Sequence, residues 1–69
     1  MTEKEIITLV KMSVIPASFT KYYVYGMEDG RCRAFTTIRE KAIATAKIEE
    51  QRSPYKQFIV VEVPPKKKP

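Results

Sequence analysis

An Asp-Gly pair at positions 29 and 30 is the feature that most limits how this chain can fold. It lies between two runs rich in aromatic and β-branched residues, 19–27 and 31–36. Asp-Gly favours a tight two-residue turn, because both central positions of the preferred turn need a positive φ angle. The sequence therefore predicts a β-hairpin made of these two runs.

The segment after the hairpin predicts a helix. Thr37 is followed three residues later by Glu40, which is the pattern of a capping box, and residues 38–52 are strong helix formers. The residues that share one helical sector are Ile38, Ala42, Ile43 and Ala46. Two of them are small, so the helix can lie close to a sheet. Pro54 ends the helix, because the residue before a proline avoids the α region.

Two further segments, residues 6–15 and 55–63, predict strands. The first is rich in β-branched residues, and its more apolar parity is Ile6, Thr8, Val10, Met12 and Val14. In the second, residues 58–61 are apolar on both parities. Such a run suits an interior strand covered on both faces, or one covered on one face with a dimer contact on the other.

The predicted fold class is α+β, with the order β-β-β-α-β. It is one largely antiparallel sheet of about four strands with a single helix on one face. Residues 1–65 form the single domain that 69 residues allow, and residues 66–69 form a basic tail that we expect to be disordered. A single helix leaves the other face of the sheet to water, to a second copy or to a partner.

The third strand indicates which side chains lie on that open face. Arg31, Arg33 and Phe35 share one parity, whereas the small residues of the other parity, Cys32, Ala34 and Thr36, suit the helix side. We therefore expect Cys32 to be a buried structural thiol.

The hairpin register decides which tyrosines join the open face. A two-residue turn pairs Val24 with Phe35 and adds Tyr22, and we favour this register. A three-residue loop with a bulge instead pairs Tyr23 with Phe35 and brings Tyr25 beside Arg33. The candidate partner-binding residues are Tyr22, Tyr23, Tyr25, Arg31, Arg33 and Phe35.

Several kinds of chemistry lack their usual residues. The chain has no histidine, one cysteine and two glycines. These counts argue against an internal disulfide, a Cys/His metal cage and a glycine-rich phosphate loop. No nucleophile has a base in a recognisable motif, so we expect neither an enzyme nor a bound cofactor or metal. A lone cysteine favours the cytoplasm, and the apolar run at residues 6–10 is too short for a signal peptide or membrane span.

The net charge of +5 overstates how basic the folded part is. Lys66, Lys67 and Lys68 supply three of these charges, which leaves +2 for residues 1–65. The three lysines are candidate phosphate contacts, but a nucleic-acid surface normally carries a stronger basic cluster. The balance favours a protein or nucleoprotein partner.

These observations predict a small protein-binding module that occludes a partner or holds it in one state. By fold-level analogy, such chains occur as phage or mobile-element inhibitors of a host machine, anti-CRISPR proteins among them. One alternative is a nucleic-acid-binding protein that uses the Tyr/Arg/Phe face and the lysine tail. Another is a structural subunit of a larger assembly, or a homodimer.

Overall fold

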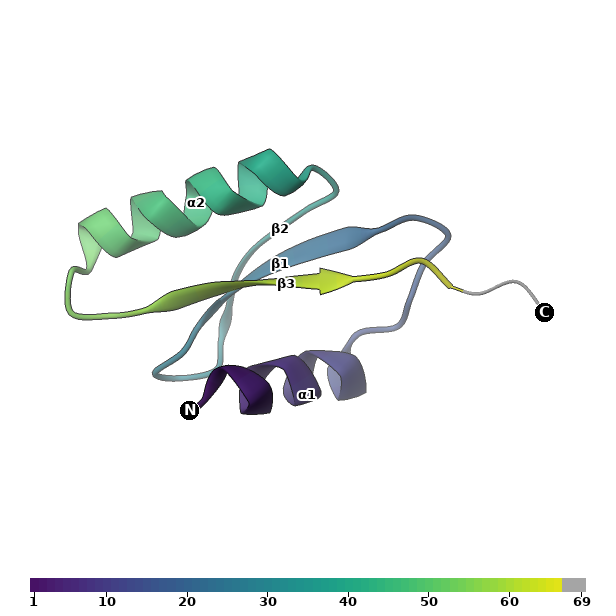
Figure 1. The fold of residues 1–69 in the computed structure, drawn as a ribbon, viewed down its shortest axis with the longest axis horizontal. Coiled ribbons are helices and arrows are strands. Elements are labelled where there is room, and N and C mark those ends of the chain that lie inside the picture. The colour runs from purple at the N-terminus through teal and green to yellow at the C-terminus, as the bar shows by residue number, and fades with distance from the viewer. Residues whose placement is uncertain (67–69) are drawn as a thin grey trace.

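The computed structural model describes residues 1–66 and places two helices around one sheet in that part of the chain (Figure 1). The elements, in chain order, are α1 (Glu3–Ser13), β1 (Lys21–Gly26), β2 (Cys32–Thr36), α2 (Arg39–Arg52) and β3 (Phe58–Val63). The three strands are antiparallel in the order β2-β1-β3. The predicted α+β class is confirmed. The prediction of about four strands and one helix is wrong, because the first predicted strand is a helix.

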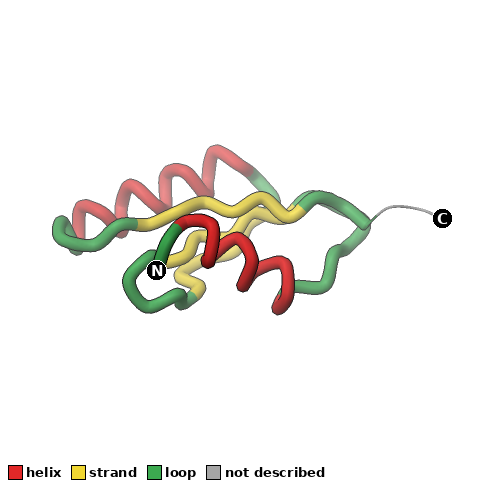
Figure 2. The backbone as a smooth tube through the Cα atoms, turned by 60° about the horizontal axis from the view of Figure 1, so that its bottom comes forward, coloured by secondary structure: helices red, strands yellow, loops and turns green. Residues whose placement is uncertain are grey.

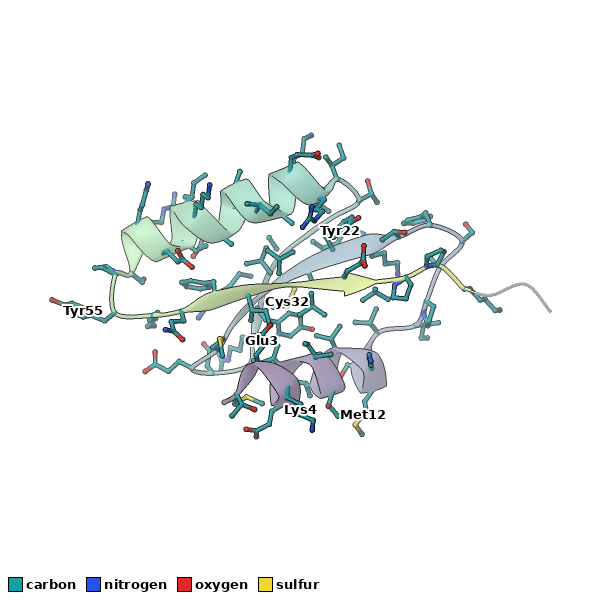
Figure 3. The ribbon with its side chains drawn as sticks, viewed as in Figure 1. Glu3, Lys4, Met12, Tyr22, Cys32 and Tyr55 are labelled. Atoms are coloured by element: carbon teal, nitrogen blue, oxygen red, sulfur yellow. The ribbon has the colours of Figure 1, made fainter. Side chains whose placement is uncertain are left out.

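The N-terminal segment forms α1 because its first turn is capped. The Thr2 hydroxyl accepts a hydrogen bond from the backbone N–H of Glu5 at 3.2 Å, and the Glu5 carboxylate accepts from the Thr2 N–H at 3.1 Å. This is a capping box. Ile6 and Val10, one helical turn apart, are both 0% exposed. Met12, which a strand would bury with them, is 82% exposed and points away from the sheet (Figure 3).

The predicted hairpin is confirmed, but the two-residue-turn register that we favoured is wrong. The alternative is correct for the pairing of Tyr23 with Phe35 and wrong for Tyr25, which pairs with Cys32 and not with Arg33. Tyr23 pairs with Phe35, and a bulge follows between Val24 and Tyr25. The connection is longer than a two-residue turn. The Gly26 N–H donates to the Arg31 carbonyl at 3.0 Å, and the Gly30 N–H donates to the Gly26 carbonyl at 2.9 Å. The predicted two-residue turn would need a positive φ at both Asp29 and Gly30. Within the described residues only Gly30 has one, +67°.

Helix α2 confirms the predicted helix, although its cap differs. The N-cap residue is Ile38, without a side-chain capping bond, so the predicted Thr37–Glu40 capping box is wrong. Instead, the Thr36 hydroxyl accepts from the Ile38 N–H at 3.1 Å. At the other end, the Ser53 N–H donates to the Glu49 carbonyl at 3.0 Å, and the helix stops before the proline as predicted.

The two helices lie on opposite faces of the sheet (Figure 2). On the α1 side the core is Ile6, Val10, Tyr25, Val61 and Val63. On the α2 side it is Val24, Ala42 and Ala46. Residues 58–61 of β3 are apolar on both parities, and each parity packs against the core of one helix. However, β3 is an edge strand and not the predicted interior strand. The face that we expected to be open is therefore partly occupied by α1.

Among the described residues, neither helix is long and apolar enough to cross a membrane.

Candidate interaction surface

The six residues predicted to bind a partner do not form one surface. Tyr23 and Phe35 point to the α1 side of the sheet, where their ring centroids are 5.2 Å apart. Tyr25 points to the same side but belongs to the core beneath α1 and is only 7% exposed. Burial raises the pKa of its hydroxyl above the ordinary value of 10.0. Tyr25 therefore stabilises the fold and is not presented to a partner.

Tyr22 lies on the opposite side, facing α2 (Figure 3). Its hydroxyl donates to the Glu62 carboxylate at 3.3 Å, and the pair lines a shallow hollow with Arg39, Ile43 and Val60. Removal from water and the neighbouring Glu62 carboxylate raise the pKa of Tyr22 above 10.0. The two-residue turn would have placed Tyr22 with Phe35, so the observed register separates them.

The bulge also removes the arginines from the face of Phe35. The Arg33 guanidinium forms a 2.7 Å ion pair with Asp29 and lies 6.0 Å from the ring centre of Phe58, which packs on the α2 side. Arg31 is exposed in the connection before β2. A hydrogen bond from the Arg31 N–H, together with the Arg33 charge, holds the pKa of Asp29 below its ordinary 3.8. Asp29 thus fixes the hairpin turn and neutralises one of the two predicted arginines.

Cys32 is not the buried thiol that we predicted. It pairs with Tyr25 after the bulge, and its side chain is exposed. Its sulfur lies 3.4 Å from the Ala34 carbonyl, in hydrogen-bonding range. The prediction assumed a regular alternation along the strand. The bulge breaks that alternation, so Ala34 packs against the α2 side whereas Cys32 does not.

Phe19 and Lys21, which are not among the predicted binding residues, complete a surface with Tyr23 and Phe35. The Lys21 ammonium lies 6.0 Å from the ring centre of Phe19 and 5.9 Å from that of Phe35. It also donates to the Ile15 carbonyl at 3.3 Å. We call Phe19, Lys21, Tyr23 and Phe35 the aromatic–lysine patch. The signal was present in the sequence, because residues 19, 21 and 23 share one parity of an extended segment.

The aromatic–lysine patch lies where α1 does not cover the sheet. Helix α1 packs on β1 and β3, and the rings of the patch extend from β1 toward the β2 edge. Phe19 is 48% exposed and Phe35 is 52% exposed, whereas Tyr23 is half-buried. Phe35 at the edge strand is held between the Tyr23 ring and the lysine. The patch is therefore mainly apolar, with its rings in mutual contact and one cation at its centre.

A second apolar surface lies on the outer side of α1. Met1, Leu9 and Met12 line a shallow hollow there, together with Thr2 and Thr8. The Met1 and Leu9 side chains also reach Gly30 of the hairpin connection. Part of this surface therefore holds the N-terminus against the hairpin.

The part of the chain that the structure describes has no group of three metal-ligating side chains. Of the candidate phosphate contacts, Lys66 is exposed and its backbone N–H donates to the Ala17 carbonyl at 2.6 Å. Lys67 and Lys68 lie outside the described residues.

No protein-family model, no curated protein and no solved structure matches this chain.

Proposed function

We propose that this chain is a protein-binding module that holds its partner on the aromatic–lysine patch, either occluding the partner or keeping it in one state. The observation that carries the proposal is the half-exposed, mutually packed pair Tyr23 and Phe35, with Phe19 on the other side of Lys21. Aromatic side chains supply large contact area at low entropic cost and are enriched at protein interfaces.

Lys21 defines the chemistry of the partner. An ammonium group has three N–H donors, and the Ile15 carbonyl accepts from one of them. The rings on both sides limit its contact with water, which strengthens its interaction with an opposite charge. A carboxylate of the partner can take the remaining donors while an apolar side chain beside it covers Phe35. The partner that fits is therefore a protein surface with an apolar residue next to an aspartate or glutamate.

Nucleic acid fits the described residues less well. The Tyr23 and Phe35 rings pack on each other at 38°, which leaves fewer free ring faces for bases. Tyr25 is buried, and Arg33 is paired with Asp29. A salt-resolved titration with short DNA and RNA strands decides between the two classes. Tight binding that falls steeply with salt and is lost in Phe35→Ser would favour nucleic acid.

The proposal is tested by affinity capture with two matched variants. Phe35→Ser removes a 52% exposed ring of the patch, and Ile48→Ser removes a 49% exposed side chain of α2, on the opposite face of the sheet. We expect Ile48→Ser to retain the partner. We expect Phe35→Ser to weaken binding by about 2 kcal/mol or more, which is about 30-fold.

Charge reversal tests the role of the lysine. Lys21→Glu should abolish capture of an acidic partner, whereas Lys47→Glu on α2 should not change it. A partner that binds both lysine variants equally would show that the lysine does not define the interface.

A further inference from the structure

Strand β3 forms one edge of the sheet, and its outward hydrogen-bonding groups can be assigned. The Met27 N–H donates to the Gln57 carbonyl at 2.9 Å, and the pairing continues as Gly26 with Phe58 and Tyr25 with Ile59. In an antiparallel ladder, bonded pairs alternate along the strand. Odd-numbered residues of β3 therefore bond to β1. The even-numbered residues, Phe58, Val60 and Glu62, direct their N–H and C=O groups away from the sheet.

No helix of the described chain covers this edge. Figure 1 looks onto β3, with α2 above it and α1 below it. The strand contains neither proline nor lysine, and its register with β1 is continuous. Proline, lysine and β-bulges are the features that usually protect an exposed edge from pairing with another chain, and β3 has none of them. The β2 edge differs, because it carries a bulge and Arg33.

We infer that the open edge of β3 pairs with β3 of a second copy of this chain, antiparallel, to form a continuous six-stranded sheet. A two-fold axis normal to the sheet relates the copies, so that both α1 helices lie on one face and both α2 helices on the other. The odd-numbered side chains of β3 then stay on the α1 side of the sheet, and the even-numbered side chains stay on the α2 side. In both copies the even-numbered residues of β3 direct their N–H and C=O groups outward. Each copy can therefore donate to and accept from the backbone of the other.

The charge pattern of β3 favours a second copy as the occupant. Glu62 is the one charged residue of the strand. A pairing centred on Val60 places Glu62 opposite Phe58 of the second copy, and a pairing centred on Val61 places it opposite Val60. Neither pairing sets the two carboxylates directly opposite each other, and the pairing centred on Val60 keeps them farther apart. A second copy therefore brings no directly opposed like charges to β3, and the added burial would support a domain too small for a large core.

This inference does not rest on the proposed function. The aromatic–lysine patch extends toward β2, which is the opposite edge of the sheet from β3. A dimer through β3 leaves both patches accessible and presents them to a partner in pairs. Loss of partner capture and loss of dimerisation can therefore be measured separately.

The test uses backbone chemistry at one position. Val60→Pro removes an outward N–H and no bond to β1, so the monomer should still fold. Val60→Ala keeps the N–H and shortens the side chain, which makes it the matched control. Sedimentation equilibrium from micromolar to millimolar chain should give twice the 8.0 kDa chain mass for the unmodified protein and for Val60→Ala. Val60→Pro should give the monomer mass, with a circular dichroism spectrum like that of the unmodified chain.

Amide hydrogen exchange gives a second measurement. It uses the unmodified chain, so it does not depend on whether Val60→Pro folds. In the dimer, the amides of Phe58, Val60 and Glu62 should exchange slowly and become faster on dilution, whereas those of Ile59 and Val61 should stay protected. A chain that sediments at 8.0 kDa throughout the range, or fast exchange at the three outward amides at high concentration, would overturn the inference. A Val60→Pro protein that remains dimeric would overturn it as well.

Discussion

Replacing Ile6 by alanine should destabilise the protein strongly, because α1 is held to the sheet mainly by two buried side chains. Ile6 is 0% exposed and packs with Val10, Tyr25, Val61 and Val63. A buried Ile→Ala change costs about 2–5 kcal/mol, and small side chains cannot easily refill the space beneath a short helix. A chain of this length has a total stability of about 3–10 kcal/mol. The expected loss of about 3 kcal/mol is thus a large part of the total.

Urea unfolding followed by circular dichroism measures this loss. With a slope of about 1 kcal/mol per molar urea for a small domain, the midpoint should fall by about 3 M. Ile6→Val, which removes one methylene, should cost about 1 kcal/mol and gives a graded variant if the alanine protein does not fold. The control is Met12→Ala on the same element, which should change stability by less than about 0.5 kcal/mol because Met12 is 82% exposed.

The same pair of variants separates the helix from the strand that the sequence predicted. In a strand over residues 6–15, Met12 would share the core face with Ile6, and both alanine variants would cost similar amounts. Equal losses for Ile6→Ala and Met12→Ala, or no loss for Ile6→Ala, would therefore refute the docking of α1 described above.

Three further predictions concern the N-terminal cap of α1 and the hairpin connection. Thr2→Ala removes the N-cap of α1 and should lower the free energy of unfolding by about 1 kcal/mol, whereas Thr37→Ala, outside any capping box, should be nearly neutral in the same urea titration. Gly30→Ala places a β-carbon at a φ of +67° and 2.6 Å from the Met1 sulfur, which must move aside, so it should cost about 1 kcal/mol or more in the same titration. The folded-state pKa of Asp29 lies below its ordinary 3.8, so its stabilising effect is complete above that pH and is lost as the pH falls through the folded value. The stability difference between the unmodified chain and Asp29→Asn should therefore shrink on acidification, and a difference independent of pH would contradict the assignment.

Patterns that depend on local chemistry predicted much of the fold. The Asp-Gly pair located the hairpin, Pro54 located the end of α2, and the two-sided apolar run located β3. The first helix was missed because residues 6–15 are rich in β-branched side chains, which favour strands only weakly and lose to tertiary packing. The capping box formed by Thr2 and Glu5 was the signal that could have identified it.

Which side chains form the aromatic–lysine patch depends on the register of the β1–β2 hairpin. The sequence left two registers open. One bulge after Val24 placed Tyr23 opposite Phe35, moved Arg33 to the α2 side and exposed Cys32. A shift of one residue exchanges the two faces of a strand, so small turn differences redistribute every candidate side chain. Lys21 could have been added by parity alone, but its contact with two rings depends on the path of the chain before β1.

The most direct test of the binding surface is to titrate the captured partner into isotopically labelled chain and record amide chemical shifts. We expect the largest changes at Phe19, Lys21, Tyr23 and Phe35, with little change along α2. Changes confined to the outer side of α1 around Leu9 and Met12, or to α2, would contradict the aromatic–lysine patch as the interface.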